Sequence, residues 1–545
     1  MDLPPITEEV LNQPPPFGDV NLATLDTPLM ESAAAAGHGE AIAAFGAAWG
    51  SAARLELGRL ANANPPLLHT HDAQGRRRDQ VEFHPAYHTL MGESVAAGLH
   101  CSGWDVAGRA DLVRRAAHLY LVTQAEAGHV CPLTMTHAAP AALAASPQLL
   151  RDWLPRIRSR RYDGRFLPFW EKAGVTIGMG MTEKQGGSDV RANITRAIPT
   201  GGDEYEITGH KWFFSAPMSD AFLVLAQAPA GLTCLLMPRF RPDGAVNGLR
   251  LMRLKDKLGN RSNASGEVEF ERAFAWRVGE EGRGVRTILR MVQLTRLDCA
   301  VSSAGLMRLA LTLALHHARH RSAFQRRLVD QPAMAMVLAD LALEAEAATA
   351  LALRLAASFE DEAANGGPRD GEAARARLLT PAVKFALCKT APAFVFEAME
   401  ALGGNGYVEE GMMPRLYREA PVNAIWEGAG NMLALDLLRG AARDPHAVHT
   451  LLAELKADAV GLPGVPAFSD ALERLIAGGA APEAHARRAA QDLSILAAAA
   501  ALARTAPPEV AEAYAATRLA RPRGGYGTNA VEDACDLLLA RAGAA

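Results

Sequence analysis

Residues 178–190 read GMGMTEKQGGSDV, and at this segment the chain changes from helical to strand-like patterning. Gly186 and Gly187, followed by Ser188 and Asp189, predict a turn whose backbone N–H groups can converge on an anion. Thr182 adds a second hydroxyl donor beside Ser188. No Gly-x-Gly-x-x-Gly follows a predicted strand here, so the segment is not a dinucleotide fingerprint of the Rossmann type. A polar loop with a helix cap explains the segment equally well, so this segment alone does not distinguish an anion-binding turn from a polar loop.

The patterning on either side of this segment divides the chain into four parts. Apolar residues at helical spacing predict a helical domain over residues 1–177, and short alternating runs separated by Gly and Pro predict a compact β domain over 178–284. The helical period returns at 285–320, 331–364, 371–403 and 430–442, which predicts an antiparallel bundle domain over 285–440. Residues 441–545 form a further Ala-rich helical extension.

Composition excludes several classes of protein. The 545 residues carry 56 Lys and Arg against 60 Asp and Glu, a net charge of −4, so the whole chain has no polyanion-binding signature. The six cysteines are scattered without a Cys-x-x-Cys pair, which argues against a disulfide framework or a zinc ribbon. We find no apolar run typical of a membrane span and no leader pattern, and we expect a cytoplasmic protein with no membrane partner.

One acidic residue stands in an unusual setting near the end of the bundle. Residues 423–431 read NAIWEGAGN, so Glu427 lies between Trp426 and Gly428. Burial raises the pKa of a carboxylic acid towards the range that suits a general base, and the glycine leaves room for a ligand. A surface glutamate beside a packed tryptophan is the plainer interpretation of this triplet alone.

An aromatic group follows at residues 209–215, GHKWFFS, where Phe213 and Ser215 end a predicted strand. Such a group can form the wall of an isoalloxazine site, although an aromatic cluster is more often core packing.

Taken together, five segments resemble the acyl-CoA dehydrogenase family in order and spacing. They are residues 181–189 (MTEKQGGSD), 257–284 (from KLGNR through EVEF to GEEGRG), 321–331 (RSAFQRRLVDQ), 402–407 (LGGNGY) and 426–428 (WEG). Further runs at 56–62, 72–77 and 258–265 resemble one branch of that family, the alkylation-inducible, DNA-binding flavoproteins of the bacterial adaptive response. With the C-terminal extension, the resemblance covers essentially the whole chain.

The resemblance implies a fold, a cofactor and an assembly. The fold is mostly α with a central β-barrel domain and an extra C-terminal helical domain; the cofactor is FAD, and the assembly is a homotetramer. Carried over residue by residue, one group contacts the flavin or pyrophosphate within a subunit: Met181, Thr182, Gly187, Ser188, Phe213, Ser215, Trp426, Gly428 and Asn431. A second group meets the FAD of a neighbouring subunit: Arg321, Phe324, Gln331, Gly403 and Gly404.

The implied chemistry is α,β-dehydrogenation of an acyl-CoA thioester, with Glu427 as the α-proton base and flavin N5 as the hydride acceptor. Some family members carry the base on a bundle helix, but the matching position here is Thr295, which cannot serve. Two departures from the family pattern are Gln325 in place of a glycine and Trp426 in place of a tyrosine.

The same branch implies duplex DNA bound through the C-terminal region. From residue 440 onward, ten Lys and Arg stand against twelve Asp and Glu, a net charge of −2, which is a poor start for phosphate binding. Local clusters remain as DNA-contact candidates, against the alternative of solvated arginines on an Ala-rich bundle: Arg487, Arg488, Arg518, Arg521 and Arg523.

Three hypotheses therefore compete: a metabolic short- or branched-chain acyl-CoA dehydrogenase with no DNA role, a DNA-associated flavoprotein with weak turnover that protects DNA or destroys alkylating agents, and a flavin-free scaffold. The intact flavin positions conflict with the third. No metal site is predicted, because His316 and His320 lack a third ligand and residues 69–72 (HTHD) are expected to be a polar loop.

Overall fold

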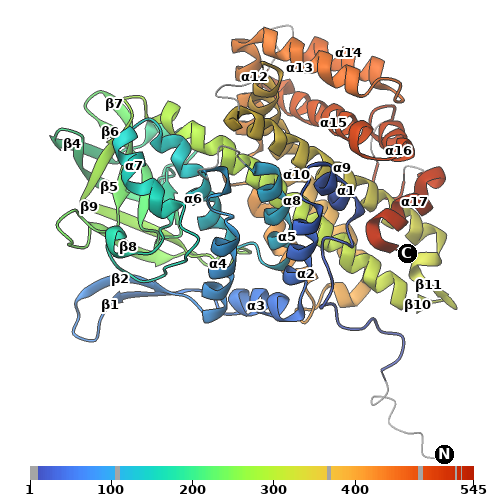
Figure 1. The fold of residues 1–545 in the computed structure, drawn as a ribbon, viewed down its shortest axis with the longest axis horizontal. Helices are drawn as coiled ribbons and strands as arrows, with labels where there is room; N and C mark the ends of the chain where they lie inside the picture. The colour runs from blue at the N-terminus through green and yellow to red at the C-terminus, as the bar shows by residue number, and fades with distance from the viewer. Residues whose placement is uncertain are drawn as a thin grey trace, which may run out of the picture.

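The computed structural model describes residues 10–104, 111–364, 370–476, 483–521, 524–528 and 531–544. A β-sheet lies at one end of the molecule, and helices make up the rest (Figure 1). The central sheet and the surrounding helices agree with the mostly α class expected from the sequence.

The N-terminal part contributes helices that cover one side of the bundle. Asp26 begins the first helix by accepting a hydrogen bond from the Leu29 N–H at 3.1 Å. The helices are α1 (Thr27–Ala35), α2 (Gly39–Trp49), α3 (Ala52–Ala63), α4 (Pro85–Ala97), α5 (Leu112–Ala125), α6 (Val130–Leu143) and α7 (Pro147–Ile157). Helices α5 and α6 are buried almost all round, because both pack against the long helix α8 (Gly284–His320).

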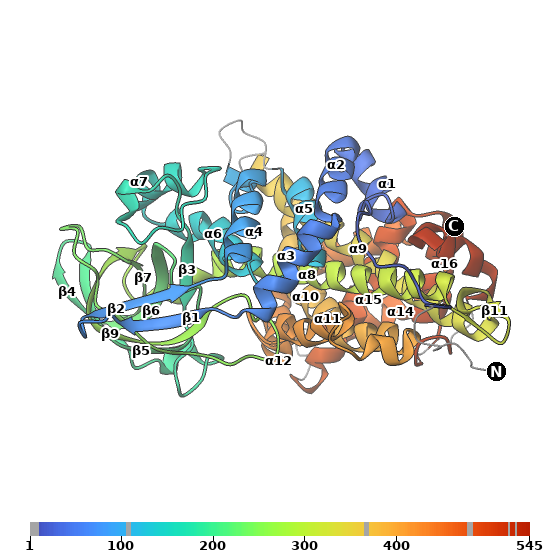
Figure 2. The same cartoon turned by 90° about the horizontal axis from the view of Figure 1, so that it is seen from below.

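The expectation of an all-helical segment to residue 177 is wrong at one place. Strands β1 (Leu67–His71) and β2 (Arg77–Glu82) form an antiparallel hairpin, so residues 69–71 belong to a strand rather than a loop. The hairpin extends from α3 towards the sheet (Figure 2), where the Leu251 N–H donates to Asp79 at 3.0 Å and Arg77 donates to the Leu251 carbonyl at 3.1 Å. The signal was missed because β1 buries neither of its faces fully and so lacks an apolar alternation.

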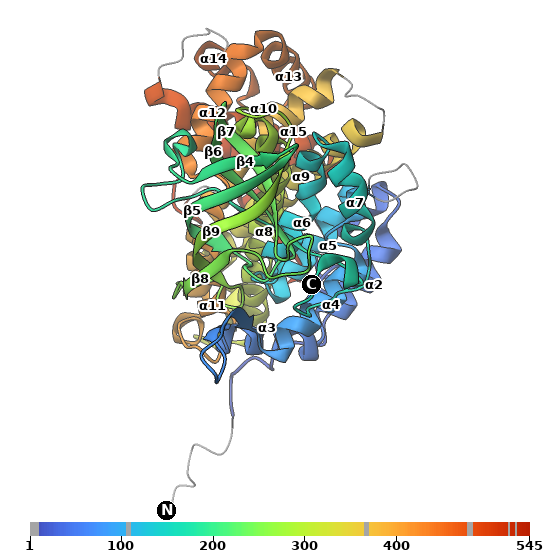
Figure 3. The same cartoon turned by 90° about the vertical axis from the view of Figure 1, so that its left-hand side faces the viewer.

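The predicted β domain is a seven-stranded sheet. Its strands are β3 (Ile177–Gly180), β4 (Arg196–Gly201), β5 (Glu204–Ser215), β6 (Ala221–Ala228), β7 (Gly231–Pro238), β8 (Leu249–Leu254) and β9 (Ser265–Val278). They pair in the order β3-β6-β4-β5-β9-β7, with β8 on β9, and a further β6–β7 pairing returns the path to β6. The result is a strongly curved central sheet (Figure 3), packed around Phe214, Phe222 and Val224.

The four bundle helices predicted from the sequence are confirmed. They are α8, α9 (Pro332–Ala364), α10 (Asp370–Ala401) and α12 (Gly430–Arg443), with α11 (Met413–Glu419) before the last of them. Two of them, Gly284–His320 and Gly371–Ala401, are long and apolar enough to cross a membrane, and 94% and 78% of their most apolar windows are buried inside the fold. That burial accounts for their composition as core helices.

The C-terminal extension packs on the bundle. Its helices are α13 (Pro445–Asp458), α14 (Val465–Ile476), α15 (Ala486–Thr505), α16 (Pro508–Arg518) and α17 (Cys535–Leu539). Helix α15 inserts a nearly continuous row of buried alanines between α9, α10 and α12. Near the end of the chain, Arg541 is held by Glu346 of α9 and Glu31 of α1, both at 2.6 Å.

Candidate functional site

The turn that carries Glu427 has a strained backbone. It lies between the short helical turn η6 (Ala420–Ala424) and α12, and Glu427 and Gly428 both have positive φ, at 58° and 101°. A non-glycine residue held in the left-handed region costs on the order of 1–3 kcal/mol, and such residues cluster at functional sites.

Two buried cations, one from α10 and one from α8, donate hydrogen bonds to the main chain of this turn. Lys384 of α10 donates to the carbonyls of Trp426 at 2.6 Å and Gly428 at 3.0 Å. Arg296 of α8 donates to the Glu427 carbonyl at 3.0 Å and is fixed in turn by Asp436 at 2.7 Å. The main chain on both sides of Glu427 is therefore fixed by charge-assisted hydrogen bonds, which leaves its side chain to be directed by its own contacts.

The Glu427 carboxylate is partly buried and accepts one hydrogen bond, from the Thr295 hydroxyl at 2.8 Å. Desolvation raises the pKa of Glu427 above its ordinary value, although the Thr295 hydrogen bond and the charges of Lys384 and Arg296 oppose this rise. The residue at the alternative base position thus supports the carboxylate instead of replacing it.

The turn after β3 is closed by backbone hydrogen bonds between Glu183 and Gly186, at 3.0 Å and 3.2 Å. The Thr182 carbonyl accepts a hydrogen bond from the Trp212 N–H at 2.8 Å, which places this residue beside β5. A Cβ added at Gly187 would lie 2.4 Å from the Thr182 Oγ1, so this turn needs glycine there. Met181 is half-buried, and Ser188 is exposed at the outer side of the turn.

Glu183, within this turn, is a structural residue that the sequence reasoning did not single out. It is fully buried and paired with Lys211 of β5 at 2.8 Å, and it also accepts from the Ile194 N–H at 2.8 Å. Burial alone would raise the pKa of Glu183, but these partners lower it to about 2. The ion pair fastens the turn to the sheet. The signal available in the sequence was an acid at position 183 within a turn expected to bind an anion.

Phe213 and Ser215, at the end of β5, lie beside this turn. Phe213 is 52% exposed, which is unusual for a phenylalanine in a strand, while Ser215 exchanges a hydrogen bond with Ser265 at 3.1 Å. Lys255 lies 4.7 Å from the centre of the Phe213 ring.

Cys131, at the start of α6, connects this region with Glu427. Burial raises the pKa of its thiol to about 12, and among the smaller influences are hydrogen bonding from Asn263 and Ser215 and the charge of Glu427. The charge of Glu427 and the hydroxyl of Ser215 therefore both act on this thiol. Sequence reasoning did not single out this cysteine, which responds to residues of both predicted sites.

The donor set of this place fits a flavin. An exposed aromatic ring at Phe213 offers an apolar face, while the hydroxyls of Thr182, Ser188 and Ser215 offer donors to a polar heterocycle and its phosphates. Trp426, whose indole donates to Asn423 at 2.9 Å, is half-buried beside Glu427.

The residues expected to meet a neighbouring subunit's FAD lie at the opposite end of the molecule, near β10 (Ser322–Ala323) and β11 (Arg326–Arg327) in Figure 1. Arg321 donates to the Asn12 carbonyl at 2.9 Å, Gln331 donates to the Ala323 carbonyl at 2.9 Å, and Phe324 is 94% exposed. The neighbouring Gln325 takes the left-handed conformation, φ 65°, despite not being glycine.

The second glycine pair belongs to the same end. Gly403 and Gly404 open the turn η5 (Gly403–Gly406), and a Cβ at either would meet nothing within 4 Å. Asn405 of this turn donates to Gln13 at 3.0 Å, one residue after the contact of Arg321, so the N-terminal segment bridges the two elements.

Asn431 forms a contact that neither expectation included. Its side-chain carbonyl accepts a hydrogen bond from Arg487 at 3.1 Å, which joins α12 to the first turn of α15. A residue predicted near FAD and a residue predicted to contact DNA are therefore bonded to each other.

The proposed DNA contacts need one correction. Arg518 is buried, pairs with Asp340 and lies 3.2 Å from Glu344, so it is not available to a phosphate. It fastens α16 to α9. Arg487, Arg488 and Arg521 are exposed, with Arg488 3.3 Å from Asp492, and Arg523 lies outside the described residues.

The histidine pair has other partners. His316 donates to the Pro15 carbonyl at 2.8 Å and His320 to the His316 carbonyl at 2.8 Å. Within the described ranges, no three His, Cys, Asp or Glu side chains are grouped to hold a metal ion.

Comparison with known proteins agrees with this geometry. Residues 12–164 match the model of the adaptive response protein AidB N-terminal domain, 178–273 the acyl-CoA dehydrogenase middle domain, and 282–442 the acyl-CoA dehydrogenase C-terminal domain. The AidB protein of Escherichia coli (strain K12) is 51% identical over 438 residues, which cover 79% of this chain and 80% of that one.

Solved structures show the same fold. Caenorhabditis elegans ACDH-11 in complex with C11-CoA superposes with a TM-score of 0.84 at 26% identity, covering 99% of this chain and 98% of that one. An acyl-CoA dehydrogenase from Bacillus anthracis complexed with FAD has a TM-score of 0.65 at 17% identity, covering 84% and 82%, a likeness of fold alone. The chain belongs to the acyl-CoA dehydrogenase family, in the branch of the adaptive response protein AidB, and its cofactor is FAD.

Proposed function

We propose that this protein is an FAD-dependent oxidoreductase that removes hydrogen from a CH–CH bond of an acyl-CoA thioester, with Glu427 as the α-proton base. The observation that carries the proposal is the Glu427 carboxylate, which is desolvated, held in a left-handed turn and hydrogen bonded to Thr295. An acyl-CoA partner is supported by the C11-CoA complex of ACDH-11.

The chain's own residues account for the proton step. Lys384 and Arg296 fix the backbone of the turn, so the carboxylate does not have to be ordered when substrate arrives. Its raised pKa makes it a stronger base than an exposed glutamate, while the Thr295 hydrogen bond favours the ionised form that can accept a proton. FAD, when bound, supplies the hydride acceptor.

Glu427→Gln tests this role. The purified wild-type protein should lose its oxidised-flavin absorbance when isovaleryl-CoA is added without oxygen, and the variant should keep its FAD without bleaching. Glu410→Gln, on the exposed loop before α11, is the matched control and should behave as wild type. Bleaching of the Glu427→Gln variant at the wild-type rate would remove Glu427 from the reaction.

We propose further that the protein binds duplex DNA and protects it from, or detoxifies, alkylating agents, with only weak acyl-CoA turnover. The support is the 51% identity to AidB and the exposed arginines of the C-terminal region, Arg487, Arg488 and Arg521. Arg518 takes no part in this proposal.

A salt titration of duplex binding tests the DNA role. Affinity should fall steeply with salt, and replacing Arg487, Arg488 and Arg521 by alanine should reduce the slope by about one for each phosphate that is no longer neutralised. Arg272→Ala, an exposed arginine on β9, is the control. Absence of binding at low salt would leave the alternative, a metabolic short- or branched-chain acyl-CoA dehydrogenase with no DNA role.

We also propose that the protein forms a homotetramer and is located in the cytoplasm. The support for assembly is Phe324, 94% exposed, and Tyr407, 82% exposed, on the surface that the N-terminal segment bridges. Light scattering should give four times the 57.9 kDa chain mass, and Phe324→Ala should shift the mass towards smaller species.

A further inference from the structure

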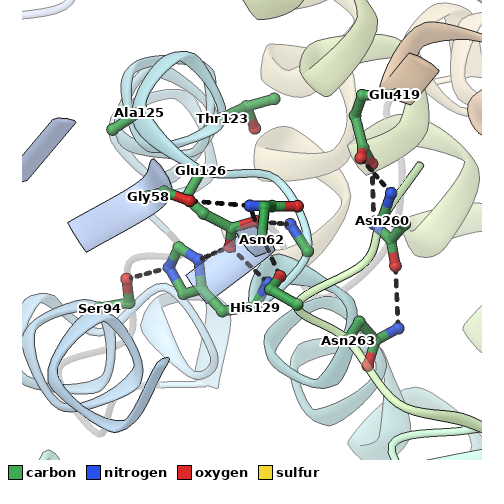
Figure 4. A network of polar contacts seen from close by, with 12 residues as sticks. Gly58, Asn62, Ser94, Thr123, Ala125, Glu126, His129, Asn260, Asn263 and Glu419 are labelled. Atoms are coloured by element: carbon green, nitrogen blue, oxygen red, sulfur yellow. Dashed lines mark hydrogen bonds and ion pairs between the residues drawn. The ribbon is translucent and has the colours of Figure 1, made fainter. Parts of the chain in front are cut away.

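The loop between β8 and β9 is held from two sides by a buried polar network (Figure 4). On one side, Asn260 donates its side-chain amide to Glu419 at 2.8 Å. On the other, Ser262 donates to Glu126 at 2.8 Å, and Glu126 also accepts from the backbone N–H of His129 at 2.8 Å and from its ring Nδ1 at 2.7 Å. The middle of the loop is thus fixed to α11 and to the start of α6.

The two ends of the loop meet each other beside the end of β5. The Lys257 ammonium donates to the Asn263 carbonyl at 2.6 Å and to the Ser265 hydroxyl at 3.1 Å. Ser265 exchanges a hydrogen bond with Ser215 at 3.1 Å, and Ser215 borders the place assigned to the ring. A chain of two hydroxyls therefore connects the ammonium to the end of β5.

Lys257 is half-buried, and its ammonium donates hydrogen bonds to neutral oxygens. The buried Lys172 and Lys211 each have a carboxylate oxygen, at 2.6 Å and 2.8 Å respectively. The buried Lys384 resembles Lys257 instead, because it donates to the carbonyls of Trp426 and Gly428. Among the described residues, no carboxylate lies within 4.0 Å of the Lys257 ammonium. A desolvated cation without a paired anion favours negative charge in its neighbourhood.

We propose that Lys257 is a positioning residue for the cofactor, whose positive charge stabilises the negative charge that the flavin ring gains on reduction. The inference rests on the proposed function in one respect: the ring must lie against Phe213 and Ser215. Lys257 itself touches neither substrate nor the reacting atoms.

The protonation of Lys257 is consistent with this role. Burial lowers its pKa to about 8, opposed by the fields of Cys131, Glu419 and Glu126. The side chain is still largely a cation at neutral pH.

Sulfite provides the test, because it forms a bond to N5 of oxidised flavin and leaves the electron pair as negative charge on the ring. Lys257→Met should weaken sulfite binding by roughly 10- to 50-fold, the loss expected when a charge about 7–12 Å from the ring is removed at an effective dielectric constant near 20. The reduction potential of the flavin should fall as well. Lys257→Arg should stay within a few-fold of wild type, and Lys456→Met, on α13, is the control.

Unchanged sulfite affinity and potential in a flavin-loaded Lys257→Met protein would overturn the proposal. If that variant is purified without flavin, reconstitution with oxidised and reduced FAD takes its place. The charge proposal requires a larger loss of affinity for reduced than for oxidised FAD, and equal losses overturn it.

None of these measurements uses acyl-CoA. A wild-type protein that binds FAD and sulfite but is not bleached by isovaleryl-CoA therefore argues against the proposed reaction and leaves the role of Lys257 intact.

Discussion

Replacing Thr295 by valine removes the hydrogen bond that the Glu427 carboxylate receives, with little change of shape. The threonine is fully buried and its hydroxyl lies 2.8 Å from the Glu427 Oε2. Because this donor favours the ionised carboxylate, its loss should raise the pKa of Glu427 further above its ordinary value.

The size of the change follows from the charge on the acceptor. A hydrogen bond to a charged group contributes about 1.5–3 kcal/mol, which corresponds to roughly one to two pH units in the pKa of the acid. Proton removal needs the ionised form, so the acidic limb of the pH profile should move to higher pH by this amount. At pH values well above the acidic limb of either profile, the variant and the wild type should react at comparable rates.

The assay is the rate of anaerobic flavin bleaching by isovaleryl-CoA across the pH range in which the protein is stable. Thr312→Val is the matched control, since the Thr312 hydroxyl donates to the Arg308 carbonyl on the same helix, at 2.9 Å. A Thr295→Val profile that coincides with wild type would refute the reasoning, because the hydrogen bond would then have no effect on the base.

Three further predictions concern the scaffold. Arg518→Ala leaves Asp340 and Glu344 buried without their counter-charge, so the free energy of unfolding in urea should fall by about 3–5 kcal/mol. The control Arg521→Ala, at an exposed position, should change that free energy little. Arg518→Ala should not alter DNA affinity per folded molecule. Glu126→Gln should be less stable than wild type by roughly 3 kcal/mol at pH 7, because the pKa of Glu126 is lowered to about 2 in the fold. A lowered pKa stabilises the folded protein at pH values above the pKa of the unfolded chain, and this stabilisation is lost as the pH falls. The difference in free energy of unfolding between the two proteins should therefore shrink below about pH 4.5. Gly187→Ala should reduce the FAD content of the purified protein, measured by absorbance, because its Cβ would lie 2.4 Å from the Thr182 Oγ1, while Gly92→Ala, which meets nothing within 4 Å, should retain flavin.

Periodicity alone located the bundle well, because α8, α9 and α10 are long helices of 37, 33 and 32 residues. The hairpin β1–β2 escaped notice because its stability comes from Asp79 and Arg77 bonding to a strand about 170 residues later, which no local pattern can show.

The residues of the candidate site were also only partly predictable from the sequence. Glu427 could be found from its neighbours and from the order of the motifs. Lys384 and Arg296 could not, since their importance lies in the carbonyls they hold across the bundle. Arg518 was misassigned for the same reason: a cluster of arginines in sequence says nothing about which of them faces Asp340 in the folded chain.

The contact of Arg541 with Glu31 has a consequence for how the chain folds during synthesis. The two side chains are 510 positions apart, and Arg308 also donates to the carbonyls of Leu25 and Ala542. Helix α1 can therefore reach its final packing only after the last helical turn has left the ribosome. Until then the apolar face of α1 lacks part of its final packing surface. Because synthesis proceeds at about 5–20 residues per second, this face stays exposed long enough for chaperones to bind the nascent chain.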